Sequence, residues 1–502
     1  MTLNRIARWL ASGLAAGAAW LAFSAPAQAI PLFARQTGHN CQACHMSFPE
    51  LTAYGREFKL NGYTFGQAQP IPLAVAVMAE YDTISNNEVH DGPGVPTTVN
   101  CTACNHATMI QYSIFFGGRI TDNFGLFGQG TGGEFPVSSG ANGETGGTFT
   151  LTADNTDIRY VHRFATESSL EPDVVVGLDI NNNLMVEDVW MTGPAWRYPN
   201  GGGGIAYSFN ASSTSTATYG LGPVTALYID NTGTTPGNGG PQKEVGVGVY
   251  AWWHKTIYAE LSLYRSPWGF FSWMAWGSGG NQASQDAPAG APGTLLANYN
   301  PYARLVYERD WGYHSLSVGF FGIDAKTYNC SPFDQACNTS TNTFKDGAID
   351  AQYQYNKGQP WIFSAQTSFE HETNNFSANA TGPAAYVLPM SSTSHTLNEF
   401  NINGRAYYDR MYGVNVGYSM IKGSSDALLY GANGSAPGAS NTGSPFSTWW
   451  TIELNYLPVQ NMRFTLQYVA YTKLNGGSSN YDGLGNDASG QNHLTAAIWW
   501  AF

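Results

Sequence analysis

The chain has 502 residues and a formal net charge of −13, with 22 basic against 35 acidic residues. This balance argues against nucleic acid as a partner, because phosphate binding requires a basic surface. Only 11% of the residues are charged, whereas 14% are aromatic and 58 are glycine. In soluble domains about a quarter of all residues are charged, so this composition favours a protein whose outer surface faces lipid.

Residues 1–29 predict a signal peptide. Arg5 and Arg8 precede the apolar run Trp9–Phe23, and Ala27-Gln28-Ala29 has the small–x–small pattern of a cleavage site. The alternative, a membrane anchor, requires a longer run of about 20 residues. Removing the two arginines leaves 20 basic against 35 acidic residues, a net charge of −15. All 6 cysteines follow the cleavage site and mature in an oxidising compartment.

Residues 30–72 predict a monohaem cytochrome c segment. Cys41-Gln42-Ala43-Cys44-His45 has the C-x-x-C-H pattern of covalent haem attachment. In this chemistry the two thiols form thioether bonds to the porphyrin, and the adjacent histidine is the proximal ligand of the iron. A disulfide or a chance match is the alternative, but the adjacent histidine and the export signal favour one covalent haem c on Cys41, Cys44 and His45.

A helix is expected directly after this motif. Ser47-Phe48-Pro49-Glu50 has the features of a helix start, Leu51, Tyr54 and Phe58 would share one face, and Gly62 is a plausible stop. A segment of this length is too short to bury a haem by itself. We therefore expect it inside the lumen of the following domain, with the helix shielding the haem from water.

The motif leaves the sixth ligand of the iron open. His39 and Met46 are so close to the haem-binding residues in sequence that either would be sterically awkward. A ligand from the following domain is therefore favoured, although each candidate is more simply an ordinary lumen or loop side chain. These candidates are Met78, His90, His106 and Met109.

Residues 73–502 show the period-two alternation of strands with two different faces. In the last segment Leu494, Ile498 and Phe502 lie on one face, with His493 and Thr495 on the other. Seven short connections alternate with eight long polar ones, which implies 16 strands. The short ones are 121–123, 166–172, 253–255, 309–312, 356–359, 409–411 and 458–461; the long ones are 85–107, 132–152, 182–241, 266–298, 324–345, 371–394, 423–445 and 473–491.

The predicted fold is all-β: a 16-stranded antiparallel outer-membrane β-barrel with a short N-terminal α-helical c-type haem segment inside the lumen. A soluble sandwich or solenoid would charge its exposed face, whereas the second face here is polar but hardly charged. Closure also satisfies every backbone hydrogen bond in lipid. Paired tryptophans at strand ends predict aromatic girdles: Trp252 and Trp253, Trp449 and Trp450, Trp499 and Trp500.

Four further cysteines lie in two of the long connections. Cys101-Thr102-Ala103-Cys104-Asn105-His106 is a haem motif with one extra residue before the histidine. A local disulfide is the simplest interpretation. The alternatives are a second haem and a metal site that uses both cysteines and His106, with or without His90. Cys330 and Cys337 likewise predict a disulfide.

Several stretches around the haem motif and in the following domain form a recognisable set. They are 33–38, 48–51, Gly55-Arg56, Phe58-Lys59, 62–64, 154–160, 181–183 and 194–196. With these stretches the N-terminal part of the chain resembles the fused monohaem cytochrome–porins of iron-oxidising bacteria. The resemblance implies an outer-membrane electron conduit that oxidises Fe(II) at the cell surface and passes electrons to a periplasmic carrier, and it carries over Cys41, Cys44 and His45 as haem residues.

Two functions compete on the residues themselves. One-electron transfer requires no acid–base residues, and no catalytic set stands out; it does require a haem near the outer surface, where a donor can approach. Loop carboxylates suit Fe²⁺, although each is more simply a solvated charge; they are Glu187, Asp188, Asp286, Asp324 and Asp334. The alternative is a porin-type channel, in which the haem segment is a plug or redox sensor. The expected partners are thus an extracellular donor, a periplasmic carrier and outer-membrane lipid.

Overall fold

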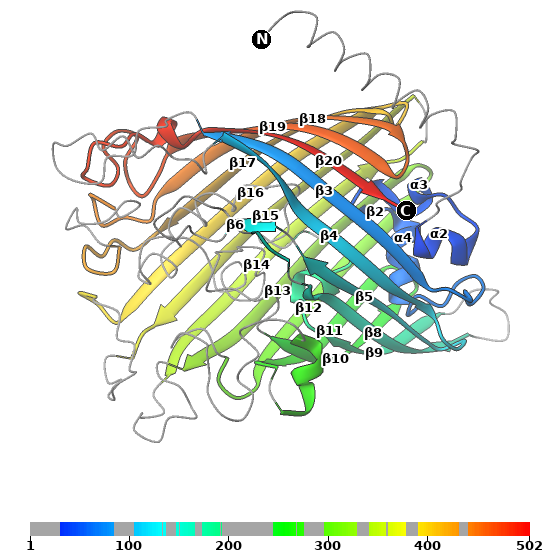
Figure 1. The fold of residues 1–502 in the computed structure, drawn as a ribbon. Helices are drawn as coiled ribbons and strands as arrows, with labels where there is room; N and C mark the ends of the chain where they lie inside the picture. Colours follow the sequence, from blue (N-terminus) through cyan, green and yellow to red (C-terminus); the bar gives the residue numbers. More distant parts are fainter. Residues whose placement is uncertain are drawn as a thin grey trace, which may run out of the picture.

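The computed structural model describes residues 31–84, 105–132, 134–136, 147–149, 151–165, 173–190, 192, 244–267, 269–275, 296–328, 341–357, 360–377, 390–430 and 440–502. The signal peptide predicted over residues 1–29 lies outside these ranges. The described strands include a closed antiparallel barrel of 16 strands (Figure 1), which confirms the predicted fold. Its strands are β3 (Leu73–Ile84), β4 (Asn105–Arg119), β5 (Phe124–Gly132), β8 (Thr152–Phe164), β9 (Val174–Asn181), β10 (Val245–Trp253), β11 (Ile257–Arg265), β12 (Asn300–Trp311), β13 (His314–Tyr328), β14 (Thr341–Tyr355), β15 (Trp361–Asn375), β16 (Ser394–Tyr408), β17 (Tyr412–Gly423), β18 (Ser447–Val459), β19 (Met462–Lys473) and β20 (His493–Ala501).

The barrel closes between its last strand and its first. Strand β20 pairs antiparallel with β3, from His493 opposite Ile84 to Ala501 opposite Ala76. Phe502 extends this pairing by two backbone hydrogen bonds with Val75, of 2.7 and 2.8 Å. The C-terminus therefore lies at the same end of the barrel as the start of β3 and the short turns, and in an outer-membrane barrel this is the periplasmic end.

The outer face of the barrel is apolar, as the alternation predicts. On β18 Trp450, Ile452 and Leu454 are 45, 46 and 53% exposed, whereas Trp449 and Glu453 point inward and are 1% exposed. Aromatic side chains stack on the outer face beside the short turns, such as the stacked rings of Tyr412 and Tyr456, 5.3 Å apart. An apolar belt with aromatic residues at its border places this barrel in the outer membrane.

Only one tryptophan of each pair can contribute to the predicted aromatic girdles. Trp253 and Trp450 are 50 and 45% exposed on the outer face, but Trp252, Trp449 and Trp499 point inward and are 4, 1 and 9% exposed. Successive residues of a strand face opposite sides of the sheet, so neighbouring tryptophans cannot both face lipid. The prediction was wrong for the inward members.

Some long connections are shorter than predicted. Strand β13 continues to Tyr328 and β14 starts at Thr341, so the strands cover both ends of the predicted loop 324–345. In this part Asp324 is paired with Lys345 across the two strands, with their charged groups 4.0 Å apart. Polar residues continue the hydrogen-bonded ladder beyond the apolar belt, and a sequence criterion based on apolar alternation therefore ends these strands too early.

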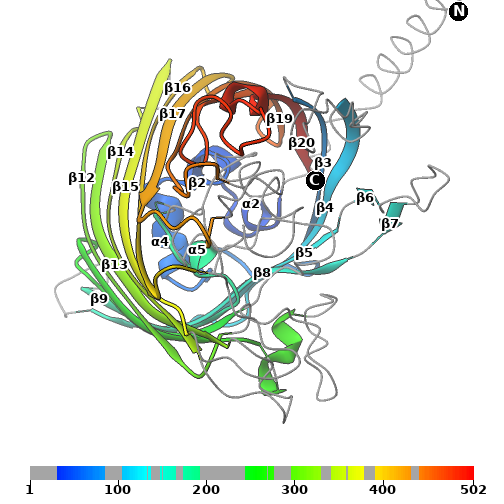
Figure 2. The same ribbon diagram turned by 90° about the vertical axis from the view of Figure 1, so that its left-hand side faces the viewer.

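The N-terminal segment lies inside the barrel, as predicted (Figure 2), and it is near the periplasmic end, beside the C-terminus (Figure 1). It consists of α2 (Leu32–Thr37), α3 (Cys41–Cys44), the two-stranded hairpin β1 (His45–Ser47) and β2 (Glu50–Leu51), and α4 (Ala53–Leu60). A short helix between β9 and β10, α5 (Leu184–Glu187), lies beside it in the lumen. None of the described helices is both long and apolar enough to cross a membrane.

Helix α4 starts later than predicted. Residues 47–51 belong to the β1–β2 hairpin, and the cap is Thr52, whose Oγ1 accepts a hydrogen bond of 3.2 Å from the Gly55 amide. This side-chain acceptor satisfies an amide that has no partner within the helix. The predicted stop at Gly62 is confirmed, because Gly62 adopts φ +68° directly after the helix and donates to the Lys59 carbonyl.

Arg56 of α4 joins the segment to the barrel wall through a buried polar network. Its Nη2 lies 2.6 Å from Glu308 Oε1 and 2.7 Å from Ser315 Oγ, and its Nη1 lies 3.1 Å from the side-chain oxygens of Gln352 and Gln354. Arg56 and Glu308 are 1 and 2% exposed. Burial of a charge is tolerated only where partners compensate it, so this network fixes α4 against β12, β13 and β14.

Two further polar contacts hold the segment at other points of the wall. Glu50 in the hairpin accepts a hydrogen bond of 2.6 Å from Arg405 of β16, and the Tyr63 hydroxyl donates one of 2.6 Å to Asp157 of β8. The lumen face is thus more charged than predicted. These charged residues of the lumen face pair with residues of the N-terminal segment. The alternation within a single strand cannot reveal such pairs.

The Arg56 network gives a test of how the segment is held. We expect Arg56→Ala to destabilise the folded barrel by about 3–5 kcal/mol, because it leaves Glu308 charged and buried without its ionic partner. Urea titration of the heat-modifiable band on a denaturing gel measures the loss.

The matched control is Lys255→Ala. Lys255, between β10 and β11, pairs at 2.8 Å with Glu57, the neighbour of Arg56 in α4, but the two side chains are 31 and 26% exposed. Its loss should cost less than about 1 kcal/mol. Equal effects of the two substitutions would contradict the anchoring role of Arg56.

Candidate haem-binding site

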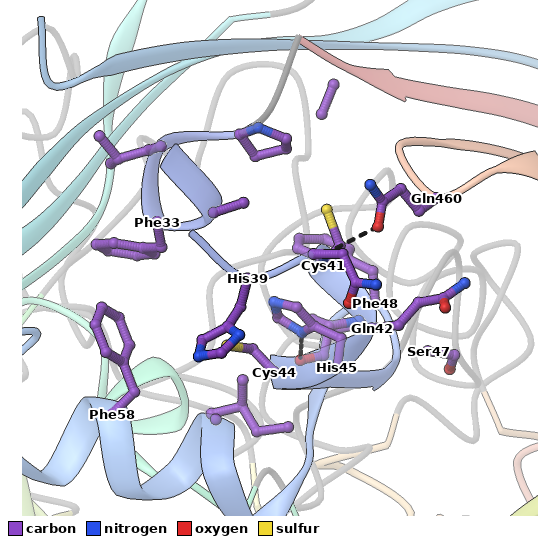
Figure 3. A pocket seen from close by; sticks show the side chains of 18 of the residues that line it. Phe33, His39, Cys41, Gln42, Cys44, His45, Ser47, Phe48, Phe58 and Gln460 are labelled. Carbon is purple, nitrogen blue, oxygen red and sulfur yellow. Dashed lines mark hydrogen bonds between the residues drawn. The ribbon is translucent and has the colours of Figure 1, made fainter. Parts of the chain in front are cut away.

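The C-x-x-C-H motif forms one helical turn followed by an extended residue. Helix α3 contains both cysteines, and Asn40 caps it with a hydrogen bond of 3.1 Å from the Ala43 amide to its side-chain oxygen. Residues three apart lie on one face of a helix, and the side chains of Cys41 and Cys44 both line one cavity. Figure 3 shows both thiols and the His45 ring at one cavity.

The β1–β2 hairpin orients the His45 ring. Pairing of β1 with β2 places His45 opposite Leu51, and His45 Nδ1 lies 3.1 Å from the Pro49 carbonyl oxygen. Burial lowers the pKa of His45, so the imidazole is neutral at pH 7. A neutral ring that donates from Nδ1 keeps its lone pair on Nε2, the arrangement that protein ligands of metals commonly use.

The Cys41 and Cys44 thiols are free in this structure. Burial raises the pKa of Cys44 to about 11, with a smaller contribution from Cys41, and burial also raises the pKa of Cys41. Both groups are therefore protonated and uncharged at neutral pH. The two thiols and the neutral imidazole thus add no charge to the cavity.

The cavity has a volume of about 240 Å³ and lies between the N-terminal segment and the wall. Phe48 of the segment stacks on Trp499 of β20, with ring centroids 4.6 Å apart, and Phe33 of α2 meets Phe58 of α4 at 5.0 Å. Most of the lining is apolar or aromatic, as a porphyrin ring requires. These residues are Leu32, Phe33, Ala34, Phe48, Leu51, Phe58, Tyr63, Ala74, Phe115, Phe127, Tyr407, Leu457 and Trp499.

Gly55 allows α4 to pack directly against the motif. A Cβ atom at this position would lie 2.2 Å from the Cys44 carbonyl oxygen, too close for any side chain. Thr52, the cap of the same helix, donates a hydrogen bond of 2.6 Å to the Ala43 carbonyl. Both contacts fix the backbone of the motif against α4, so the thiols and the helix keep a constant relative position.

Two turns of the barrel contact the motif from the other side. Gln460, between β18 and β19, accepts a hydrogen bond of 3.1 Å from the Cys41 amide. Arg410, between β16 and β17, donates to the Gln42 and His45 carbonyls at 3.3 and 3.5 Å and to the Asn356 side chain. No sequence pattern points to Gln460 or Arg410, because both are more than 350 positions from the motif.

Arg410 is a cation that the described part of the chain leaves without a carboxylate partner. Its hydrogen bonds go to neutral oxygens, and burial lowers its pKa. It lines the cavity together with Lys59 and Arg463. A haem carries two propionate groups, and Arg410 offers them a charge partner. The residues present therefore fit a covalent haem c.

The structure changes the ranking of the candidates for a sixth ligand. His39 and Met46, both considered sterically awkward, line the cavity. Met78 is buried in an apolar cluster with Trp499 and is not among the lining residues. His90 and the side chains of His106 and Met109 lie outside the described residues.

Several other predicted residues are not at the cavity. Glu187 and Asp188 are not loop residues at the surface but buried in the lumen, 1 and 2% exposed, because the chain after β9 folds inward. Asp324 belongs to β13. The remaining ones lie outside the described residues: Cys101, Cys104, Asp286, Cys330, Asp334 and Cys337.

No protein-family model and no curated protein matches this chain. Solved structures that resemble it include the channel DcaP of Acinetobacter baumannii, with 11% identity, a TM-score of 0.40, and coverage of 86% of this chain and 96% of that one. The anion-selective porin of Comamonas acidovorans has 10% identity, a TM-score of 0.40 and coverage of 86 and 98%. A loop-deletion mutant of OmpT of Vibrio cholerae has 10% identity, a TM-score of 0.39 and coverage of 86 and 98%. These values carry no inference about function.

Proposed function

We propose that residues 31–72 carry one covalent haem c in the cavity described above, and that the protein is an electron conduit of the outer membrane. The observation that supports this most is the arrangement of the motif: two free thiols and a neutral His45, with Nδ1 held by Pro49, line one apolar cavity. The uncompensated Arg410 supports it further. A bound haem supplies one-electron chemistry that the protein side chains lack.

The position of the cavity restricts the electron donor. The cavity is lined by residues beside the short turns, including Arg410 and Gln460, so it lies at the periplasmic end. The expectation of a haem near the outer surface was therefore wrong. A periplasmic carrier can approach this end directly, whereas an extracellular donor must be small enough to enter the lumen. Fe(II), the donor implied by the family resemblance, meets this requirement.

A second candidate function is that of a porin-type channel. A closed barrel of 16 strands is wide enough for an aqueous pore, and the architecture by itself favours this function. The buried contacts of Arg56 and Trp190 across the lumen oppose it, since Trp190 is 1% exposed and donates to Glu308 of the wall at 2.8 Å. The N-terminal segment and α5 together occupy the lumen of the conduit that we propose.

Haem attachment is tested directly by substitution. We expect Cys41→Ala/Cys44→Ala to lose covalent haem, measured as the pyridine haemochrome and by haem staining on a denaturing gel. His45→Ala should keep the thioether bonds but change the spin state of the iron, visible in the absorption spectrum. Cys330→Ala/Cys337→Ala removes two cysteines elsewhere and should retain the haem. Covalent haem in the first double variant would refute the site.

The iron assignment has a separate test. Anaerobic mixing of the purified protein with Fe²⁺ should reduce the haem within seconds to minutes, because the donor can enter the lumen. Stopped-flow absorption at the haem bands follows the reaction. Spectra that stay oxidised would refute Fe(II) as the donor, while leaving the haem site itself intact.

Planar-bilayer recording separates the conduit from the channel. The purified protein should give no steady large conductance, because the N-terminal segment is anchored across the lumen by buried contacts. A steady large conductance in the unmodified protein would instead support the porin-type function.

A further inference from the structure

Three buried carboxylates meet in the lumen at a position that the haem motif does not involve. Asp179 is on β9, Glu260 is on β11, and Glu187 ends the short helix α5. One oxygen atom from each lies within 4.8 Å of the other two. The three residues are at most 2% exposed, so water does not screen the repulsion between their charges.

The strand between β9 and β11 leaves space for this group. Gly248 of β10 is directly opposite Asp179 on one side and Ser262 on the other. A Cβ atom at Gly248 would lie 2.9 Å from Asp179 Oδ2 and 2.1 Å from Ser262 Oγ. The glycine therefore keeps open the space into which Asp179 Oδ2 projects.

Hydrogen bonds orient the carboxylates, but two of the carboxylate oxygens accept none. Asp179 Oδ1 accepts from Asn181 at 2.8 Å, and Glu187 Oε1 accepts from Arg159 at 3.0 Å. Within the described part of the chain Asp179 Oδ2 and Glu187 Oε2 are buried without a hydrogen-bond partner. A buried polar atom without a partner is costly, and two such oxygens beside a third carboxylate indicate that a ligand compensates them.

The local charges have the matching excess. Arg159 pairs with Asp157 and Glu187 at 2.9 and 3.0 Å, and Lys59 lies 3.5 Å from Asp157. When Asp179 and Glu260 are also ionised, four carboxylates stand against these two cations, a formal excess of two negative charges. A divalent cation would neutralise this excess.

We propose that Asp179, Glu187 and Glu260 bind one divalent cation of the class that prefers oxygen ligands. Carboxylate oxygens suit Mg²⁺, Ca²⁺, Mn²⁺ and, with less preference, Fe²⁺. Tyr258, which donates to Glu260 Oε2 at 2.9 Å, and Asn181 hold the ligands in orientation. Hydrogen-bond partners of this kind tune metal affinity without contacting the ion.

The site is next to the haem-binding cavity. Val186 lines that cavity and directly precedes Glu187. Lys59 of α4, which also lines the cavity, donates a hydrogen bond to the Val186 carbonyl. A ferrous ion bound here would lie beside the cavity in which we propose the haem. This last step rests on the proposed electron-transfer function, whereas cation binding does not.

Manganese binding tests the site without any redox reaction. The full-length protein in detergent at pH 7 is titrated with Mn²⁺, and the six-line EPR signal of the free ion reports the unbound fraction. We expect one saturable site per chain. Asp179→Asn and Glu260→Gln should each weaken binding at least about tenfold, because each removes a charged ligand, and Gly248→Ala should also weaken it by filling the space.

Glu372→Gln is the matched control. Glu372 is a fully buried lumen carboxylate opposite Asp346 on the neighbouring strand, so its loss removes the same charge without removing a proposed ligand. It should keep the affinity for Mn²⁺ within about twofold. Heat modifiability of every variant establishes that each barrel is folded before the titrations are compared.

Three outcomes decide the proposal. Binding of Mn²⁺ that is lost in Asp179→Asn and kept in Glu372→Gln supports the proposal. Anaerobic competition by Fe²⁺ would then show that the site also binds ferrous iron. Equal weakening in all variants, or no saturable binding, overturns it and means that the carboxyl groups share protons instead. Because Mn²⁺ binding is measured without electron transfer, a protein that lacks haem can still pass or fail this test.

Discussion

The ion pair between Arg56 and Glu308 is the contact on which the organisation of the lumen depends. Both groups are almost completely buried, and each would be costly without the other. Their pairing fixes helix α4, and through Gly55 and Thr52 it fixes the backbone of the C-x-x-C-H motif. The barrel wall thus supplies polar anchors as well as the apolar lining of the cavity. A segment of about forty residues can in this way present a buried site that it could not build alone.

The same arrangement separates two regions of different chemistry within a short distance. On one side of Lys59 the cavity is apolar and contains the uncharged thiols and a neutral imidazole. On its other side the lumen holds Asp157, Asp179 and Glu187, with Arg159 between them. In the function that we propose, the negative charge on this second side would attract cations toward the haem. Both regions are built from residues of the N-terminal segment and of the barrel wall. Neither the segment nor the wall could form either region alone.

The barrel could be predicted from the sequence because its signal is local. Alternation of apolar and polar residues repeats within each strand, and the order of short and long connections gives the number of strands. The C-x-x-C-H motif is equally local. By contrast, the contacts of Arg56 with Glu308 and of Arg410 with the motif join positions hundreds of residues apart. The carboxylates Asp179, Glu187 and Glu260 come from two strands and a helix, and no spacing rule connects them.

Errors of prediction also have physical causes. The helix start was placed at Ser47–Glu50 because a proline and a glutamate favour a first turn, but Thr52 provides the side-chain acceptor that a helix start requires. Glu187 and Asp188 looked like surface charges because the connection after β9 is long and polar. They are instead turned inward, where Arg159 and Arg304 compensate them; Arg304 lies 3.2 Å from Asp188.

The position of the motif has a consequence for the biogenesis of the protein. Cys41 and Cys44 face a cavity bounded by residues of β16, β18, β19 and β20, strands that end the chain, and β20 completes the ring by pairing with β3. Once this seam has formed, both cysteines are only partly exposed, and an attachment enzyme would have to reach them through the periplasmic end of the barrel. The haem that we propose at Cys41 and Cys44 would therefore be attached most readily before the barrel closes, as a step of periplasmic maturation rather than a late addition to the assembled protein.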